Sequence, residues 1–283
     1  MYRAVRHLPV PQRVYQHLHF DGVFSFALFE GGQVRMRSHG HVVENELFWR
    51  GRGGAEPTSL QLWERLARRV SGQILDIGAN TGVFACVAKV AAPNARVTAF
   101  EPLSRVARWL RENVDLNGGG VIVIEKAVSD RSGTAQIHDS ADPSSDVNCY
   151  SASLENAFDF NTVTYEIPTM ALDDWVEPDA PVGLIKLDVE CHEPAALRGM
   201  QRVLKRDRPA VLIEILNDEI GREASESFEG LDYNFYQVDE QRGLIASDRL
   251  APLGGTDRNN LAIPVEMLKR IDLDGLMAGR MPA

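Results

Sequence analysis

Short apolar runs alternate with segments of helical periodicity over most of the chain. The run Gln73-Ile74-Leu75-Asp76-Ile77 predicts a buried strand, and residues 95–100 predict the next one. Between these two strands, residues 83–88 begin a helix. Further strands are predicted at 121–128, 183–187, 209–215, 233–238 and 260–264, and helices at 57–70, 103–114, from 194 onward and at 265–276. This alternation is typical of an α/β fold with a mainly parallel sheet.

Two regions interrupt the alternation. Residues 23–29 and 33–37 flank a glycine turn and predict a hairpin, so we expect a β-rich extension over residues 1–55 and a main domain over 56–283. Residues 133–181 form an insertion that contains a predicted strand at 162–169 and a polar, mobile stretch at 139–146. We expect this insertion to be either a lid over the ligand site or a plain surface excursion.

The first strand of the main domain leads into the loop Gly78-Ala79-Asn80-Thr81-Gly82. Glycines let a ligand approach the backbone, and the free N–H groups of the following helix attract negative charge. The loop lacks the Gly-x-Gly-x-x-Gly spacing of dinucleotide binding and the Lys of a P-loop. It has Asp76 instead, which suits a positively charged group such as an α-amino group. S-adenosylmethionine combines such an amine with an adenosine; the alternative is an ordinary strand-to-helix turn.

Two further positions fit the adenosine of such a ligand. Glu101, followed by Pro102, ends the second predicted strand, where an acid accepts hydrogen bonds from both ribose hydroxyls. The end of the third strand, at Ala127, is expected beside the adenine. The predicted cofactor-binding residues are thus Asp76, Gly78, Ala79, Asn80, Thr81, Gly82, Glu101, Pro102, Ala127 and Asp188.

Four ionisable residues follow the strand at 183–187, namely Asp188, Glu190, His192 and Glu193. Ligands of open α/β sheets bind at this edge. His192 is the candidate general base, because an imidazole titrates near neutral pH. Asp188 is expected to orient the acceptor or contact the cofactor, and Glu190 or Glu193 to hold His192 in its useful tautomer. Alternatively, His192 caps the helix that begins at 194.

A metal-assisted version of the same chemistry remains open. Asp188 and Glu214 both end predicted strands and would bind Mg²⁺, which lowers the pKa of an acceptor hydroxyl. Two ligands are few, so the preferred prediction uses no metal. The histidine pairs His17/His19 and His39/His41 have strand spacing, but no further ligand lies beside them. We therefore interpret them as solvent-facing strand residues.

Charge and cysteine content limit the partners and the compartment. The net charge is −10, and 20 Lys/Arg against 34 Asp/Glu follow residue 70, so we expect no nucleic-acid substrate. No apolar run reaches the length of a membrane helix, and residues 1–7 lack the apolar stretch of a secretory signal. Three cysteines without metal-ligand spacing suit a reducing compartment. We expect a cytoplasmic protein, with the oligomeric state open and a dimer among the options.

Four motifs occur in order, and together they point to a family: Asp76-Ile77-Gly78-Ala79-Asn80-Thr81-Gly82, Phe100-Glu101-Pro102, Ile185-Lys186-Leu187-Asp188-Val189-Glu190 with His192-Glu193, and Asn260-Leu261-Ala262-Ile263-Pro264. The chain resembles the FkbM-type S-adenosylmethionine-dependent methyltransferases over residues 56–264. The resemblance implies a Rossmann-like class I fold, with a seven-stranded, mostly parallel sheet in the order 3-2-1-4-5-7-6. Its last strand is antiparallel, and helices cover both faces.

The resemblance also implies a reaction, the O-methylation of a hydroxyl on a small molecule or a sugar, as in natural-product and glycan modification. Residues 56–283 would then be the methyltransferase domain, with Asp188, Glu190 and His192 as the catalytic residues. Cys191 stands where the family has Gly, and a positive φ there would strain the loop by about 1 kcal/mol. Alternatives are an NAD-dependent oxidoreductase, which would show a different glycine spacing, and a non-catalytic cofactor-binding protein.

Overall fold

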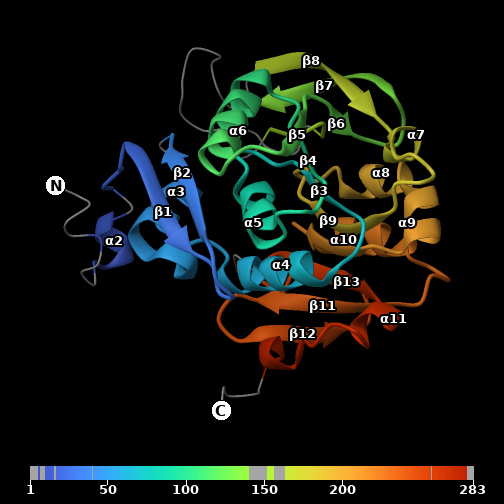
Figure 1. Cartoon of the computed structure of the whole chain (residues 1–283). Helices are drawn as coiled ribbons and strands as arrows, with labels where there is room; N and C mark the ends of the chain where they lie inside the picture. Colours follow the sequence, from blue (N-terminus) through green and yellow to red (C-terminus); the bar gives the residue numbers. More distant parts are fainter. Residues whose placement is uncertain are drawn as a thin grey trace.

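The core of the protein is an eight-stranded mixed sheet in the order β12-β11-β13-β10-β9-β3-β4-β5 (Figure 1). The structure is a computed structural model that describes residues 6, 10–15, 17–39, 41–139, 152–155, 163–255 and 257–278. The strands are β3 (Gln73–Ile77), β4 (Val97–Phe100), β5 (Val121–Ile124), β9 (Val182–Leu187), β10 (Ala210–Glu214), β11 (Tyr233–Asp239), β12 (Gly243–Ser247) and β13 (Asn259–Pro264). Strands β5, β4, β3, β9 and β10 pair in parallel, whereas β13 is antiparallel to β10 and to β11.

The sheet has one strand more than the predicted seven. Numbered along the chain, the seven strands without β12 lie in the order 3-2-1-4-5-7-6, and β12 adds to the outer edge of β11. A tight turn joins β11 to β12, in which the Asp239 carboxylate accepts hydrogen bonds from the backbone N–H groups of Gln241 and Arg242, at 2.9 and 2.8 Å. This turn makes the short apolar run 243–247 a strand, which its length alone did not indicate.

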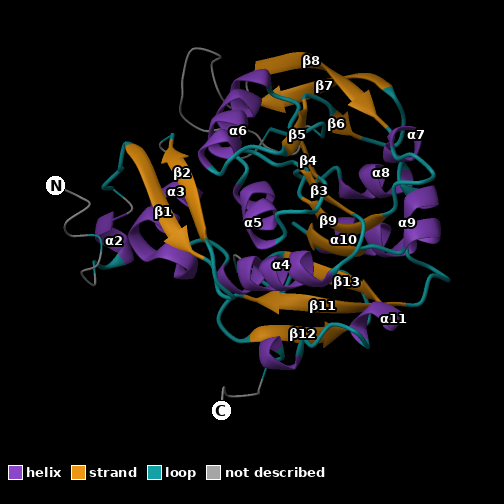
Figure 2. Ribbon diagram, viewed as in Figure 1, coloured by secondary structure: helices purple, strands orange, loops and turns teal. Residues whose placement is uncertain are grey.

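Alternate residues of the sheet pack against opposite helix layers. Ile74 of β3 and Leu184 of β9 join the core beneath α4 (Pro57–Arg69) and α5 (Val83–Ala91), whereas Leu75 and Ile185 face the other side. The helices of that other side are α7 (Leu172–Trp175), α8 (Glu193–Arg198), α9 (Gln201–Asp207) and α10 (Asp218–Glu226). Figure 2 shows both helix layers around the strands. Strands buried on both faces explain the near-continuous apolar runs of the sequence.

The predicted third strand, 121–128, is divided between two sheets. Strand β5 ends at Ile124, whose carbonyl accepts a hydrogen bond from the Glu101 N–H at 3.0 Å, and Ala127–Val128 form β6 of a second sheet. This sheet has the order β6-β8-β7, with β7 (Gly133–Asp139) antiparallel to β8 (Val163–Met170). Strand β8 matches the prediction at 162–169 to within one residue. Of the predicted mobile stretch, only Asp139 lies in the described residues.

The N-terminal extension is not mainly β. Its hairpin consists of β1 (Gly22–Ala27) and β2 (Gln33–Ser38), but α2 (Gln12–Tyr15), α3 (Val42–Arg50) and the 3₁₀ turn η1 (Gly51–Gly53) are helical. Leu47 and Phe48 of α3 are fully buried in the same hydrophobic core as α4 and α5. An apolar helix face against the main domain, rather than sheet pairing, therefore determines the structure of residues 42–50.

The interpretation of the paired histidines as solvent-facing strand residues is wrong. His39 and His41 follow β2 and contact Trp109 of α6 (Ser104–Leu116), with ring centroids 4.9 and 5.2 Å apart. His41 is only 3% exposed. His17 and His19 are exposed but precede β1. Spacing alone could not reveal the indole between the second pair.

The C-terminal helix is shorter than predicted. Residues 265–276 form only α11 (Val265–Leu268) and the 3₁₀ turn η2 (Asp274–Leu276). Among the described residues, no helix has both the length and the apolar character needed to cross a bilayer.

A close backbone contact joins the end of β3 to the end of β9. Gly78 has a φ of +79°, and a Cβ placed on it would lie 1.7 Å from the carbonyl oxygen of Asp188. The Asp188 N–H in turn donates to the Ile77 carbonyl at 3.0 Å. Only glycine fits a position with both a left-handed backbone and no room for a side chain.

We predict that Gly78→Ala destabilises the protein by about 3 kcal/mol or more, because the new Cβ forces the two strand ends apart. Gly118→Ala is the matched control: its φ is +87°, but a Cβ placed on it would have no atom within 4 Å. That variant is expected to lose only about 1 kcal/mol. Urea denaturation of both variants measures the difference, and equal losses would contradict the steric explanation.

Candidate active site

A cavity of about 250 Å³ opens at the carboxyl ends of the central strands. It brings the glycine loop and the acid–histidine segment into one site, although they are far apart in the sequence. The predicted site residues that line it are Asp76, Gly78, Ala79, Asn80, Thr81, Glu101, Pro102, Ala127, Asp188, Glu190 and His192. Gly82 does not line the cavity. It supports the loop from behind, where a Cβ would lie 2.2 Å from Leu110 Cδ1.

Two buried oxygen atoms in this cavity have no partner in the protein. They are Oδ2 of Asp76, whose residue is 1% exposed, and Oδ1 of Asn80. Burial raises the pKa of the Asp76 carboxyl to about 7, although the nearby Lys186 ammonium opposes the rise. A buried oxygen without a partner is costly, so both atoms are suited to accept hydrogen bonds from a ligand.

Glu101 is held in place by two backbone groups. Its Oε2 accepts a hydrogen bond from the Asn80 N–H at 3.0 Å, and its Oε1 accepts one from the Leu103 N–H at 2.9 Å. Burial nevertheless raises the pKa of this carboxyl to about 7. Because each carboxylate oxygen has a second lone pair, Glu101 can still accept hydrogen bonds from ligand hydroxyls.

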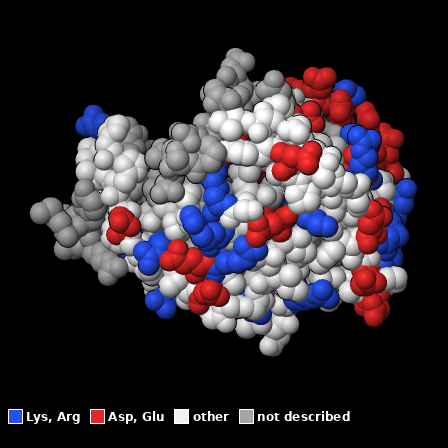
Figure 3. Space-filling view, turned by 90° about the horizontal axis from the view of Figure 1, so that it is seen from above, with Lys and Arg blue, Asp and Glu red and all other residues white. Residues whose placement is uncertain are grey.

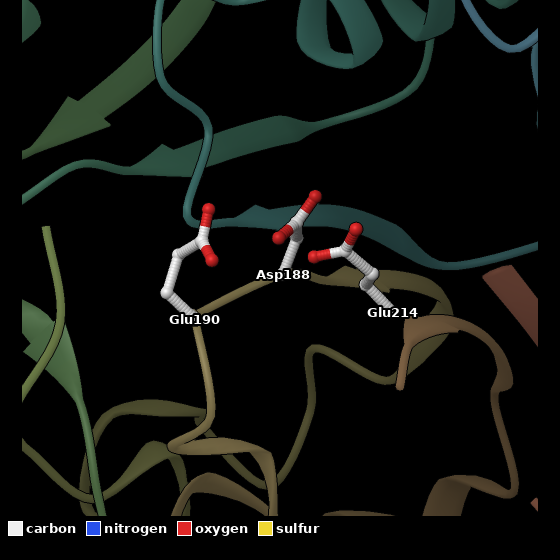
Figure 4. Close-up of side chains that lie close together, drawn as sticks. All are labelled: Asp188, Glu190 and Glu214. Atoms are coloured by element: carbon white, nitrogen blue, oxygen red, sulfur yellow. The ribbon is translucent and has the colours of Figure 1, made fainter. Parts of the chain in front are cut away.

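Lys186 is the cation at the centre of the acidic side of the cavity. Its Nζ lies 3.0 Å from Asp188 Oδ2, and its side chain is 1% exposed. The carboxylates of Asp188, Glu190 and Glu214 point toward one another, with one oxygen of each within 4.8 Å of the others (Figure 4). Burial and the neighbouring carboxylates raise the pKa of Glu190 and of Glu214. One lysine therefore faces more negative charge than it can neutralise, so this side of the cavity favours cations.

His192 has a partner on each ring nitrogen. Nδ1 lies 2.8 Å from Oε1 of Glu155, and Nε2 lies 2.9 Å from the Ser129 hydroxyl. The expectation that Glu190 or Glu193 holds the ring is wrong, since Glu193 Oε1 instead accepts the Val189 N–H at 3.0 Å. His192 occupies the N-cap position of α8, but its side chain does not cap the helix. An imidazole between a carboxylate and a hydroxyl is well oriented for proton transfer.

The loop that carries His192 has two consecutive residues in the left-handed region. Glu190 has a φ of +54° and Cys191 a φ of +77°. Cys191 therefore stands at a position that favours glycine, as the resemblance implied, and it stores strain in the loop.

Several lining residues were not predicted from the sequence. Val43, Ala55 and Glu56 come from the N-terminal extension and the start of α4, and Ala152 and Leu154 come from the insertion. Only Lys186 had a readable signal, as a lone cation within a buried apolar strand. The other lining residues are ordinary surface or apolar positions until the chain folds.

The sheet order and the cavity at the carboxyl ends of its strands define a Rossmann-like α/β protein that binds its ligand at the strand-order reversal. The sequence profile of the family described as Methyltransferase FkbM domain matches residues 76–241, more than half of the chain. The chain belongs to this family. It is a methyltransferase that uses S-adenosylmethionine, and this favours the methyltransferase over the NAD-dependent interpretation.

Solved structures with a similar fold include three methyltransferase-type proteins. Methyltransferase FkbM from Methylobacillus flagellatus is 15% identical, with a TM-score of 0.44 over 68% of this chain and 43% of its own. A SAM-dependent methyltransferase from Agrobacterium tumefaciens is 11% identical (TM-score 0.46, 86% and 70%). Fibrillarin from Aeropyrum pernix, solved with bound S-adenosyl-L-methionine, is 13% identical (0.45, 87% and 95%). This chain thus spans less than half the length of the first. A search of curated proteins finds no match.

The residues present fit this cofactor. The unpartnered Asp76 oxygen suits its ammonium group, Glu101 suits its ribose hydroxyls, and the surplus of carboxylates beyond Asp188 suits its positive sulfonium. The close approach at Gly78 leaves the loop backbone open to the ligand.

We predict that Cys191→Gly is more stable than Cys191→Ala. Both variants lack the thiol, but only glycine adopts a φ of +77° without steric strain. The expected difference is up to about 1 kcal/mol, because the greater unfolded-state freedom of glycine offsets part of the gain. Guanidinium denaturation compares the two, and a glycine variant that unfolds first would show that the loop is not strained.

Proposed function

We propose that this protein transfers the methyl group of S-adenosylmethionine to a hydroxyl oxygen of a small molecule or a sugar. The observation that carries the proposal is that the unpartnered Asp76 oxygen and the His192 ring line one cavity. The first marks a place for the amino-acid end of the donor, and the second can accept a proton from a hydroxyl. A methyltransferase acting on carbon or on a basic nitrogen has less need of this imidazole.

In this mechanism the chain orients the two reactants and accepts a proton. Asp76, Asn80 and Glu101 bind the donor, which supplies an electrophilic methyl group when bound. Asp188, held by Lys186, orients the acceptor hydroxyl. As the oxygen gains the methyl group, its proton passes to His192, and the Glu155 carboxylate stabilises the resulting imidazolium.

We further propose that the metal-free version of this reaction operates. Asp188 and Glu214 do meet in the site, together with Glu190. The Lys186 ammonium, however, already contacts Asp188 Oδ2 at 3.0 Å and supplies positive charge there. Activity that is abolished by EDTA and restored by Mg²⁺ would instead support the metal-assisted version.

The insertion at 133–181 is proposed as a lid. Its residues 152–155 contribute Ala152 and Leu154 to the cavity, and the Ser153 hydroxyl donates to the Glu190 carbonyl. Glu155 adds the contact with His192. The segment therefore contacts the catalytic loop directly, as a substrate cover would.

The acceptor is proposed to be a cytoplasmic hydroxyl compound rather than a nucleic acid. On the face drawn in Figure 3, Lys and Arg side chains lie among Asp and Glu side chains. Such a mixed surface, with a net charge of −10, gives little attraction for a phosphate backbone. Methyl transfer from labelled S-adenosylmethionine to a panel of sugars and phenols, with amines as the contrast set, tests the proposal. Transfer to amines alone would overturn it.

We predict that His192→Ala lowers kcat by 10²-fold or more, on the order expected for loss of a general base, while the Kd for S-adenosylmethionine changes little. His17→Ala, at an exposed histidine outside the site, is the control. Steady-state kinetics and calorimetry measure the two quantities. If cofactor affinity is lost in parallel with kcat, His192 has a structural role.

We predict that the affinity for S-adenosylmethionine rises as the pH increases from 5.5 to 7. Burial places the pKa of the free Asp76 carboxyl at about 7, and a bound ammonium favours the carboxylate. Binding therefore releases a proton below pH 7, with up to a tenfold gain in affinity per pH unit, and levels off above it. The pKa of Glu101, also about 7, adds to the slope.

Asp76→Asn should weaken binding at pH 8 and reduce the slope by about one proton. Calorimetry over this pH range measures both effects, with thermal melts as the control for folding. A pH dependence that survives the substitution unchanged would exclude Asp76 as the ammonium site.

A further inference from the structure

The N-terminal extension reaches the cofactor cavity, although it lies outside the matched family segment 76–241. Val43 of α3 and Ala55 line the same cavity as the glycine loop. In Figure 1 the extension lies beside α5 and α6, on one side of the main sheet. It is therefore close enough to influence the loop that binds the cofactor.

Asn113 of α6 joins the extension to the glycine loop through one side chain. Its Nδ2 donates to the Thr81 carbonyl at 2.8 Å, and its Oδ1 accepts from the Arg37 N–H of β2 at 2.8 Å. The residue is fully buried. Both atoms of a single amide are thus used, one on each segment, and neither has water as an alternative partner.

A second contact reaches the same threonine from α3. Glu44 is fully buried, and its carboxylate accepts a hydrogen bond from the His39 N–H. Burial raises the pKa of this carboxyl to about 7, and the Thr81 hydroxyl is among the groups that oppose the rise. Trp109, between His39 and His41, fixes the position of the extension on α6.

The glycine loop needs such support. Gly78, Asn80 and Gly82 all have positive φ, with Asn80 at +49°. A non-glycine residue in the left-handed region costs about 1–2 kcal/mol, so the loop holds this conformation only while its surroundings enforce it. Thr81 lies between Asn80 and Gly82, where an external hydrogen bond has most effect on the loop.

We propose that the N-terminal extension is a functional part of the cofactor site, and that Asn113 is the positioning residue through which β2 holds the glycine loop in its binding conformation. Cofactor binding and docking of the extension are then thermodynamically linked: each stabilises the other by the same factor. The proposal concerns cofactor binding alone and does not depend on the chemistry of the methyl acceptor.

Asn117, one helical turn later, provides a matched control. Its Oδ1 accepts from the Arg35 N–H at 2.9 Å, and its Nδ2 donates to the Arg35 carbonyl at 2.7 Å. Asn117→Ala therefore loses an α6–β2 connection of the same kind, whereas Asn113→Ala also loses the bond to Thr81. Asn113→Asp retains an acceptor for Arg37 but not the donor to Thr81.

The experiment measures the Kd for S-adenosylhomocysteine by calorimetry and the Tm of each full-length variant. We expect both alanine variants to lower the Tm, but only the two Asn113 variants to raise the Kd, by about tenfold, as for loss of one buried hydrogen bond. Equal changes in Kd for Asn113→Ala and Asn117→Ala, or none in either, would overturn the proposal.

A second measurement needs no variant to fold. Hydrogen exchange of the Arg37 amide in the wild-type protein is expected to slow by at least about tenfold when S-adenosylhomocysteine is added. The amide of Val23 in β1, on the far strand of the hairpin, serves as a reference for general stabilisation. If Arg37 gains no more protection than Val23, the proposed link between the loop and β2 is absent. A protein that fails to bind the cofactor at all would instead refute its site assignment.

Discussion

The active site depends on the contact between Gly78 and the carbonyl of Asp188. This contact brings the turn after β3 against the end of β9, with no space for even a methyl group between them. The loop that binds the donor and the segment that carries the catalytic candidates are thereby fixed relative to each other. In-line methyl transfer requires this precision, because reactivity falls steeply when reacting atoms move by an ångström.

The charge distribution of the cavity follows from the same arrangement. Parallel strands end at one edge, so the acids at the ends of β3, β4, β9 and β10 converge there, and Lys186 is the cation among them. Burial raises the pKa of Asp76 and of Glu101 to about 7, so the free site retains protons at neutral pH. A positively charged ligand relieves this cost, which is a physical reason for the site to favour the charged donor.

The regular elements and much of the site could be predicted from the sequence, because each depends on local patterns. Apolar runs located strands such as β3 and β10, and the glycine loop with Asp76 indicated a ligand site. The errors arose where distant residues decide the outcome. Residues 42–50 became a helix by packing against the main domain, and Glu155, not Glu190 or Glu193, contacts His192.

The sequence by itself determined the fold class, the family and the residues that contact the cofactor site from the strand ends, since strand order and glycine spacing are written in short motifs. Only the tertiary structure decided what surrounds them. It placed Val43 and Ala55 in the cavity wall, bound Thr81 to Asn113, and put Ser129 beside His192. These contacts join segments that are far apart along the chain, and no local pattern records which distant surface a buried side chain will meet.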